Sequence, residues 1–144
     1  MFEYLSKLSV NFLGVIMSTI VGQIISVIWF ALIFAKTWDK YSGFNEEELK
    51  KVKADHNKPK TIYFSLLEQF ISAYFYAVLM HNLNITSLMG AGILGLVIWA
   101  GFMATVGVNE VIWHREKAQF YILNQACYLV RTVLKGVVYF YIVS

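Results

Sequence analysis

Four apolar stretches, each about as long as one membrane crossing, constrain this chain more than any other feature. They cover approximately residues 10–35, 62–80, 88–108 and 120–143. A bilayer core about 30 Å thick needs about 20 mostly apolar residues for each helical crossing. Only 15% of the residues are charged, whereas roughly 25% are charged in an ordinary soluble domain. The sequence therefore predicts an integral membrane protein with four spans.

The spans are expected to be helices, because hydrocarbon offers no water to satisfy free backbone groups. They also lack the alternation of apolar and polar residues that is typical of barrel strands. We therefore expect an all-α polytopic membrane protein, a four-transmembrane-helix bundle that forms a single domain over residues 1–144. The tripeptide Val-Ile-Trp occurs at 27–29 and again at 97–99, in the first and third spans. This recurrence favours two parallel helical hairpins.

Basic residues outside the spans gather in two loops, at 36–61 and 109–119. These residues are Lys36, Lys40, Lys50, Lys51, Lys53, Lys58, Lys60, Arg115 and Lys117. The opposite side has only Lys7, in the N-terminal tail. Because cytoplasmic segments retain Lys and Arg, both loops are expected in the cytoplasm and both termini outside. We expect a multi-pass protein of a plasma or inner membrane.

The loop at 36–61 contains a pattern typical of a short capped helix. Asn45 precedes three glutamates, and lysines follow them, which predicts an amphipathic helix over about 45–54. Such a helix would lie on the membrane surface, where its lysines favour anionic lipid. The alternative interpretation is a solvated connector.

Three charged residues lie within the predicted spans: Glu68 in the second, and Arg131 and Lys135 in the fourth. Each costs about 2.5–3.5 kcal/mol at this depth on insertion scales, so we expect them to face the bundle interior and to be functional. Further polar residues lie on the same helical faces or at a matching depth. These are Gln23, Gln69, Asn124 and Tyr128. We predict a connected polar core in which Glu68 and Arg131 are paired directly or bridged by Asn124, Tyr128 or water. A purely structural role is the alternative.

Small residues indicate close helix packing. In the first span they recur at every fourth position, and the third span is rich in glycine. The residues we predict to pack are Gly14, Ser18, Gly22, Ser26, Gly95 and Gly101. Such faces let two helix backbones approach closely in lipid. They could join helices within one chain or between chains, and we expect a homo-oligomer, with a dimer favoured.

Few residues indicate chemistry that depends on a bound group. The chain has one cysteine, Cys127, and its three histidines fall on opposite sides of the predicted membrane. No paired-cysteine, phosphate-loop or zinc-protease motif occurs. We therefore expect no metal, no cofactor and no nucleic acid. The expected partners are membrane lipid and a second copy of the chain, with a different membrane protein as an alternative.

Three segments carry a resemblance to a known family. Residues 29–38 read Trp-Phe-Ala-Leu-Ile-Phe-Ala-Lys-Thr-Trp, residues 99–102 Trp-Ala-Gly-Phe, and residues 122–128 Ile-Leu-Asn-Gln-Ala-Cys-Tyr. The chain resembles a widespread family of small four-helix membrane proteins, filed only as domain of unknown function 1761. The resemblance implies four spans and no particular activity. It draws attention to Trp29, Trp38, Trp99, Asn124 and Tyr128.

Three classes of function follow from these patterns. The leading hypothesis is transport or permeation of a small solute or ion through the intramembrane polar site. The second is a non-catalytic structural or accessory membrane subunit that docks a partner or lipid. The third is a membrane-embedded enzyme for a lipid-soluble substrate, with Glu68 as acid or base and Arg131 holding an anion.

Overall fold

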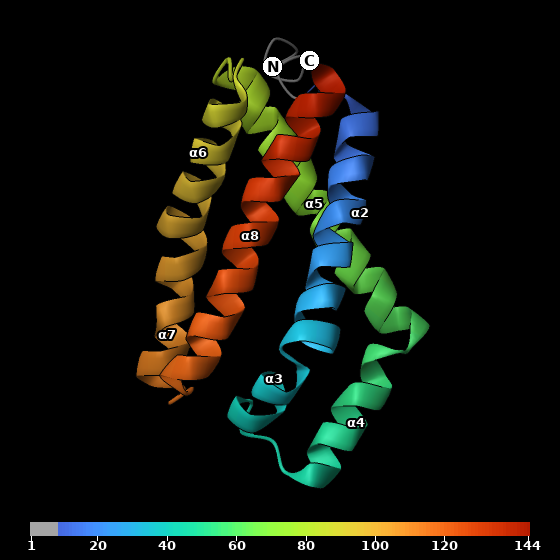
Figure 1. Ribbon diagram of the computed structural model, residues 1–144, viewed down its shortest axis with the longest axis vertical. Coiled ribbons are helices and arrows are strands. Elements are labelled where there is room, and N and C mark those ends of the chain that lie inside the picture. The colour runs from blue at the N-terminus through green and yellow to red at the C-terminus, as the bar shows by residue number, and fades with distance from the viewer. Residues whose placement is uncertain (1–8) are drawn as a thin grey trace, which may run out of the picture.

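The computed structural model describes residues 9–144, and within them the chain forms only helices and loops (Figure 1). Four continuous helical stretches are long and apolar enough to cross a membrane. They are α2 (Phe12–Val27) with η1 (Ile28–Ile33), α5 (Pro59–Asn82), α6 (Leu88–Ile98) with η2 (Trp99–Ala104) and α7 (Thr105–Trp113), and α8 (Ala118–Val143). The predicted all-α, four-span fold is confirmed. Lys7, which was counted in predicting the orientation in the membrane, lies outside the described residues.

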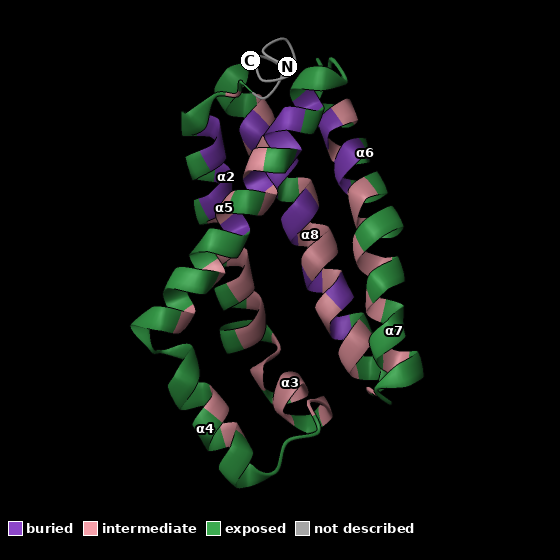
Figure 2. Cartoon of the chain, turned by 180° about the vertical axis from the view of Figure 1, so that it is seen from behind, coloured by how far each residue is buried: buried purple, intermediate pink, exposed green. Residues whose placement is uncertain are grey.

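The long helices alternate in direction, and α8 lies at their centre (Figure 1). It packs against α2 on one side and α6 on the other, whereas α5 packs mainly against α2. We call the end that carries α3 (Ala35–Tyr41) and α4 (Glu46–His56) the loop end. The opposite end, where residues 83–87 join α5 to α6, is the hairpin end. Figures 1 and 2 show that α5 runs obliquely and lies away from α7 at the loop end.

Local sequence explains where the helices begin and end. Asn11 caps α2, and its side chain accepts a hydrogen bond from the Gly14 N–H at 3.0 Å. Pro59 is the first residue of α5, a position that needs no N–H donor. The third long helix continues beyond residue 108 to Trp113, so only residues 114–117 connect it to α8.

The loop end is held together by polar and aromatic contacts. Asn45 caps α4 in a reciprocal capping box with Glu48. The Lys53 ammonium pairs with the Asp39 carboxylate at 2.6 Å and so ties α4 to α3. The Trp38 ring packs against several rings around it. Those rings belong to Phe44, His56 and Phe120.

Buried residues concentrate in the half of the bundle nearer the hairpin end (Figure 2). Here Val15, Ala73, Ala77 and Ala91 are at most 2% exposed. The Tyr76 hydroxyl, also buried, donates to the Ala91 carbonyl at 2.5 Å. Small side chains bring the helices close, and this half of the bundle forms a dense apolar core.

Two of the long helices contain a wide π-helical turn, and each turn begins inside one copy of Val-Ile-Trp and extends beyond it. One turn spans Ile28–Ile33 and the other Trp99–Ala104. At the first, the Phe34 N–H donates to the Trp29 carbonyl, five residues back, at 2.9 Å. Wide turns of this kind occur mostly as single insertions in α-helices and are frequent at functional sites.

Candidate functional site

The small-residue face of α2 packs within the chain, against α8. The Ser18 hydroxyl donates to the Lys135 carbonyl at 3.0 Å, and the Ser26 hydroxyl accepts from Arg131 at 3.3 Å. A side chain at Gly14 would meet the Tyr139 ring at 2.7 Å. This face therefore brings α2 close to the charged residues of α8 and is covered by the same chain. A homodimer stays a prediction.

The glycines predicted to pack divide into two groups. A Cβ at Gly22 would lie 2.5 Å from both the Gln69 Oε1 and the Lys135 Cε, so the missing side chain makes room for them. A Cβ at Gly95 would lie 2.9 Å from the Val133 Cα, so α6 approaches α8 closely there. At Gly101, by contrast, an added Cβ would meet no atom of residues 9–144 within 4 Å.

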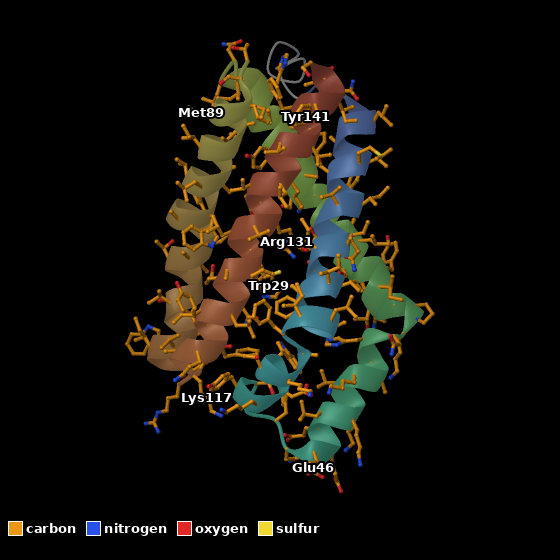
Figure 3. All side chains as sticks on the ribbon, in the orientation of Figure 1. Trp29, Glu46, Met89, Lys117, Arg131 and Tyr141 are labelled. Carbon is orange, nitrogen blue, oxygen red and sulfur yellow. The ribbon has the colours of Figure 1, made fainter. Side chains whose placement is uncertain are left out.

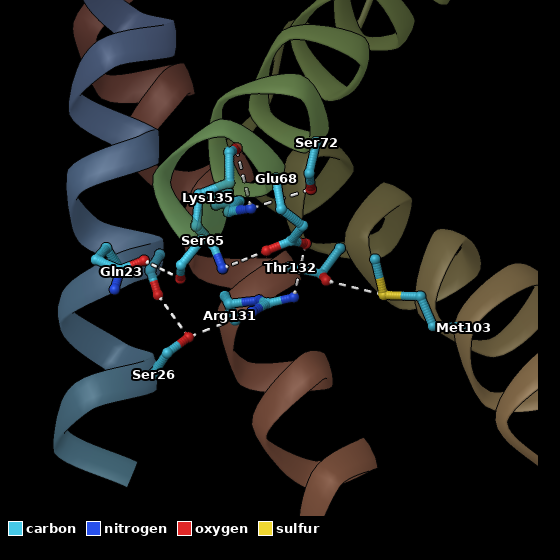
Figure 4. Close-up of polar contacts among 11 residues, drawn as sticks. Gln23, Ser26, Ser65, Glu68, Ser72, Met103, Arg131, Thr132 and Lys135 are labelled. Carbon is cyan, nitrogen blue, oxygen red and sulfur yellow. Dashed lines mark hydrogen bonds and ion pairs between the residues drawn. The ribbon is translucent and has the colours of Figure 1, made fainter. Parts of the chain in front are cut away.

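Glu68 and Arg131 form a direct ion pair between α5 and α8 (Figure 4). The Arg131 Nη2 donates to the Glu68 Oε1 at 3.1 Å. Its guanidinium also lies over the Tyr128 ring, 4.8 Å from the ring centroid. The Arg131 side chain is 10% exposed, but the Glu68 side chain is 52% exposed. The pair thus has one end inside the bundle and the other at its surface.

Helix geometry explains how the two residues meet. Glu68 lies nine residues after Pro59 on α5, and Arg131 lies thirteen residues after Ala118 on α8 (68 − 59 and 131 − 118). The long Arg131 side chain leans toward the start of α8, as helical side chains do, and reaches the loop-end side. Figure 3 shows Arg131 and Trp29 between α8 and α2.

Lys135 lies one helical turn further along α8 and is 1% exposed. Its ammonium donates to the Ser72 hydroxyl at 3.0 Å and to the Gln69 carbonyl at 3.4 Å. Among the described residues, no carboxylate lies within ion-pair distance of it. A buried ammonium held only by neutral oxygens is costly in a low-dielectric interior.

Some of the remaining residues predicted for the polar site lie with Glu68, Arg131 and Lys135, and others lie outside this set. Gln69 donates to the second carboxylate oxygen of Glu68 at 2.8 Å, and Gln23 accepts from Ser65 at 2.8 Å. Asn124 forms none of the described hydrogen bonds to Glu68 or Arg131. Hydrogen bonds connect six residues, from Ser26 through Arg131, Glu68 and Gln69 to Lys135 and Ser72, whereas Gln23 and Ser65 form a separate pair beside them (Figure 4). We call the two groups together the polar cluster. It consists of Gln23, Ser26, Ser65, Glu68, Gln69, Ser72, Arg131 and Lys135.

Two hydrogen-bonding atoms of the polar cluster are buried without a partner in the described part of the chain: the Arg131 Nε and the Gln69 Oε1. Buried polar atoms of native proteins usually have a partner, so an unpaired one indicates a ligand, a water or a functional constraint. Sequence spacing does not predict that either atom is unpaired, because this depends on the side-chain geometry.

A shallow groove of about 440 Å³ runs along α5 beside the polar cluster. Phe64, Leu67 and Ile71 provide its apolar walls, and Glu68 and Ser72 provide its polar groups. Each polar group contacts a cation of α8: Glu68 contacts Arg131, and Ser72 contacts Lys135. The groove therefore lies on α5 beside the two side chains that contact the buried cations.

Sequence reasoning does not identify Gly136 as a packing residue. A side chain there would collide with the Tyr76 hydroxyl and ring. Gly136 lies directly after Lys135 in the fourth span, whereas the small residues predicted to pack lie in the first and third spans. Its role depends on a tyrosine of another helix, which sequence distance does not reveal.

Comparison with known proteins gives a family but no activity. The family model described as "Protein of unknown function (DUF1761)" matches residues 13–140 and so includes the whole polar cluster. No curated protein and no solved structure matches the chain.

Proposed function

The chain belongs to this DUF1761 family of proteins of unknown function, and from the geometry of its polar cluster we propose that it moves a small solute or ion across a membrane. The Glu68–Arg131 pair is the observation on which this proposal depends. Ionic groups at the middle of a span are costly and usually mark pathways or binding sites. A solute could reach the half-exposed Glu68 carboxylate from the surface and then bind the buried Arg131 guanidinium.

The half of the bundle at the hairpin end is closely packed, whereas the half at the loop end is more open. A transport site that is accessible from one side of the membrane at a time would have this asymmetry. Toward the hairpin end, Val15, Ala73 and Ala77 lie in a buried apolar core. Toward the loop end, α5 lies away from α7, and Glu68 lines an open groove. If the basic loops face the cytoplasm, as their charge predicts, this conformation opens toward the cytoplasm or the inner leaflet.

Electrophysiology on solid-supported membranes tests this proposal. Proteoliposomes containing the wild-type chain are challenged with a panel of small carboxylates, chloride, inorganic phosphate and amines, and charge movement is recorded. We expect at least one solute to give a current that Glu68→Gln and Arg131→Met abolish. Glu110→Gln is the matched control, because Glu110 lies on α7 and pairs with His114 outside the polar cluster.

Unchanged currents in folded, monodisperse Glu68→Gln and Arg131→Met variants would contradict transport through this site. Loss of current in Glu110→Gln as well would show that the effect is not specific to the polar cluster.

A further inference from the structure

We propose that the solute is a monovalent carboxylate with an apolar body, bound through Arg131 and Lys135 with its body in the α5 groove. This inference rests on the proposed function, because it names the chemical class that the same site takes. Three observations support it. The Arg131 guanidinium has an unused hydrogen-bond donor, the polar cluster has an excess of positive charge, and the α5 groove beside the cluster has apolar walls.

Glu68 uses only half of the binding edge of Arg131. The Nε and Nη2 groups lie on the same edge of a guanidinium and together form a fork that matches a carboxylate. Glu68 accepts from Nη2 alone, and the Nε–H is buried without an acceptor. A second carboxylate that shares or takes over this edge would satisfy the Nε–H.

Charge also favours an anion. The polar cluster contains the cations Arg131 and Lys135 and the single carboxylate Glu68, which leaves one positive charge in excess when all three are ionised. The other members are neutral amides and hydroxyls, and the adjacent phenol of Tyr128 is neutral too. A monovalent anion makes the site neutral, whereas a cation adds to the excess. Burying an uncompensated charge is costly, so the neutral complex is favoured.

The groove indicates what lies beyond the carboxylate. Phe64, Leu67 and Ile71 line it, and their side chains offer no hydrogen-bonding group. Glu68 and Ser72, which contact the two cations, lie one helical turn apart in the same groove. A ligand with its carboxylate at this position therefore extends its apolar part along the walls.

Binding of 4-fluorobenzoate to the full chain in lipid nanodiscs, followed by fluorine NMR, tests the proposal. The 4-fluorobenzylammonium ion is the matched probe of opposite charge. We expect saturable binding of the benzoate only. Arg131→Lys keeps the charge but loses the fork, and should raise the dissociation constant at least about tenfold. Glu68→Gln removes a competing negative charge, and should lower the dissociation constant about threefold or more.

The opposite shifts overturn the proposal. It fails if the benzoate does not bind, if neither variant changes its affinity, or if the ammonium ion binds and Glu68→Gln abolishes that binding. Because Glu68→Gln is expected to strengthen binding, an unfolded variant cannot imitate the result. Charge movement without benzoate binding would refute the carboxylate assignment alone. Benzoate binding without charge movement of any solute would refute the transport proposal and leave the binding site.

Discussion

Trp29 and Trp99 belong to different helices, yet their indole N–H groups donate to backbone carbonyls two residues apart on α8. Trp29 donates to the Leu123 carbonyl at 3.2 Å, and Trp99 to the Gln125 carbonyl at 2.9 Å. Both tryptophans end a Val-Ile-Trp tripeptide and lie in a wide π-helical turn. The two flanking helices are thus fastened to one turn of the central helix on its loop-end side, next to the polar cluster.

Replacing either tryptophan by phenylalanine tests this attachment. Trp29→Phe and Trp99→Phe each remove one hydrogen bond and leave a helical carbonyl with its ordinary partner, so each should lower the free energy of unfolding by about 1 kcal/mol. Trp113→Phe is the control, because Trp113 is 77% exposed. Thermal unfolding in detergent measures the difference. Equal stability of all three variants would show that the indole contacts contribute nothing.

Much of this fold could be predicted because a bilayer restricts the choices so strongly. In a bilayer without water, four long apolar segments can form little besides four helices. The structure contains these four helices. The wide turns at Ile28–Ile33 and Trp99–Ala104 could not be predicted. Neither a proline nor a paired glycine marks them in the sequence. The repeated Val-Ile-Trp tripeptide coincides with both turns, but in the sequence it favours two parallel helical hairpins and does not predict a wide turn.

Glycine packing in the apolar core gives a second prediction. Gly136→Ala should lower the free energy of unfolding by about 1–3 kcal/mol, because the added methyl group displaces the Tyr76 ring and its hydrogen bond to Ala91. Gly92→Ala is the matched control, since Gly92 faces open space in the middle of α6. It should be neutral or stabilising by up to about 1 kcal/mol, through helix propensity. Denaturant titration compares the two. A larger loss for Gly92→Ala would contradict the packing.

Cys127 provides a natural reporter of the α2–α8 contact. It is the only cysteine of the chain, is fully buried, and lies one turn from the carbonyl that Trp29 contacts. We expect no reaction with a water-soluble maleimide in the folded protein and complete reaction in denaturant. Trp29→Phe should raise the labelling rate several-fold, because it weakens the contact that covers the thiol. Mass spectrometry measures the labelled fraction.

Lys117→Cys, at an exposed position, is the control for reagent access. Rapid labelling of Cys127 in the folded wild-type chain would contradict the described packing of α8 against α2.

The sequence predicts the charged members of the polar cluster better than it predicts how their side chains are arranged. Glu68, Arg131 and Lys135 stand out because charge is rare in a span, and a meeting of the first two was one of the predicted arrangements. The unpaired Nε of Arg131 could not be foreseen, because it depends on which guanidinium nitrogen faces Glu68. The groove depends on the oblique path of α5, which local sequence does not encode.

The most direct test of the central claim is a double-mutant cycle on Glu68 and Arg131, read out by charge movement in proteoliposomes and by unfolding free energy. If the two act as one unit, Glu68→Gln, Arg131→Met and the double variant lose the current equally. The double variant is then more stable than the sum of the single losses predicts, by at least about 1 kcal/mol. Additive stability losses, with currents that persist in either single variant, would contradict the account.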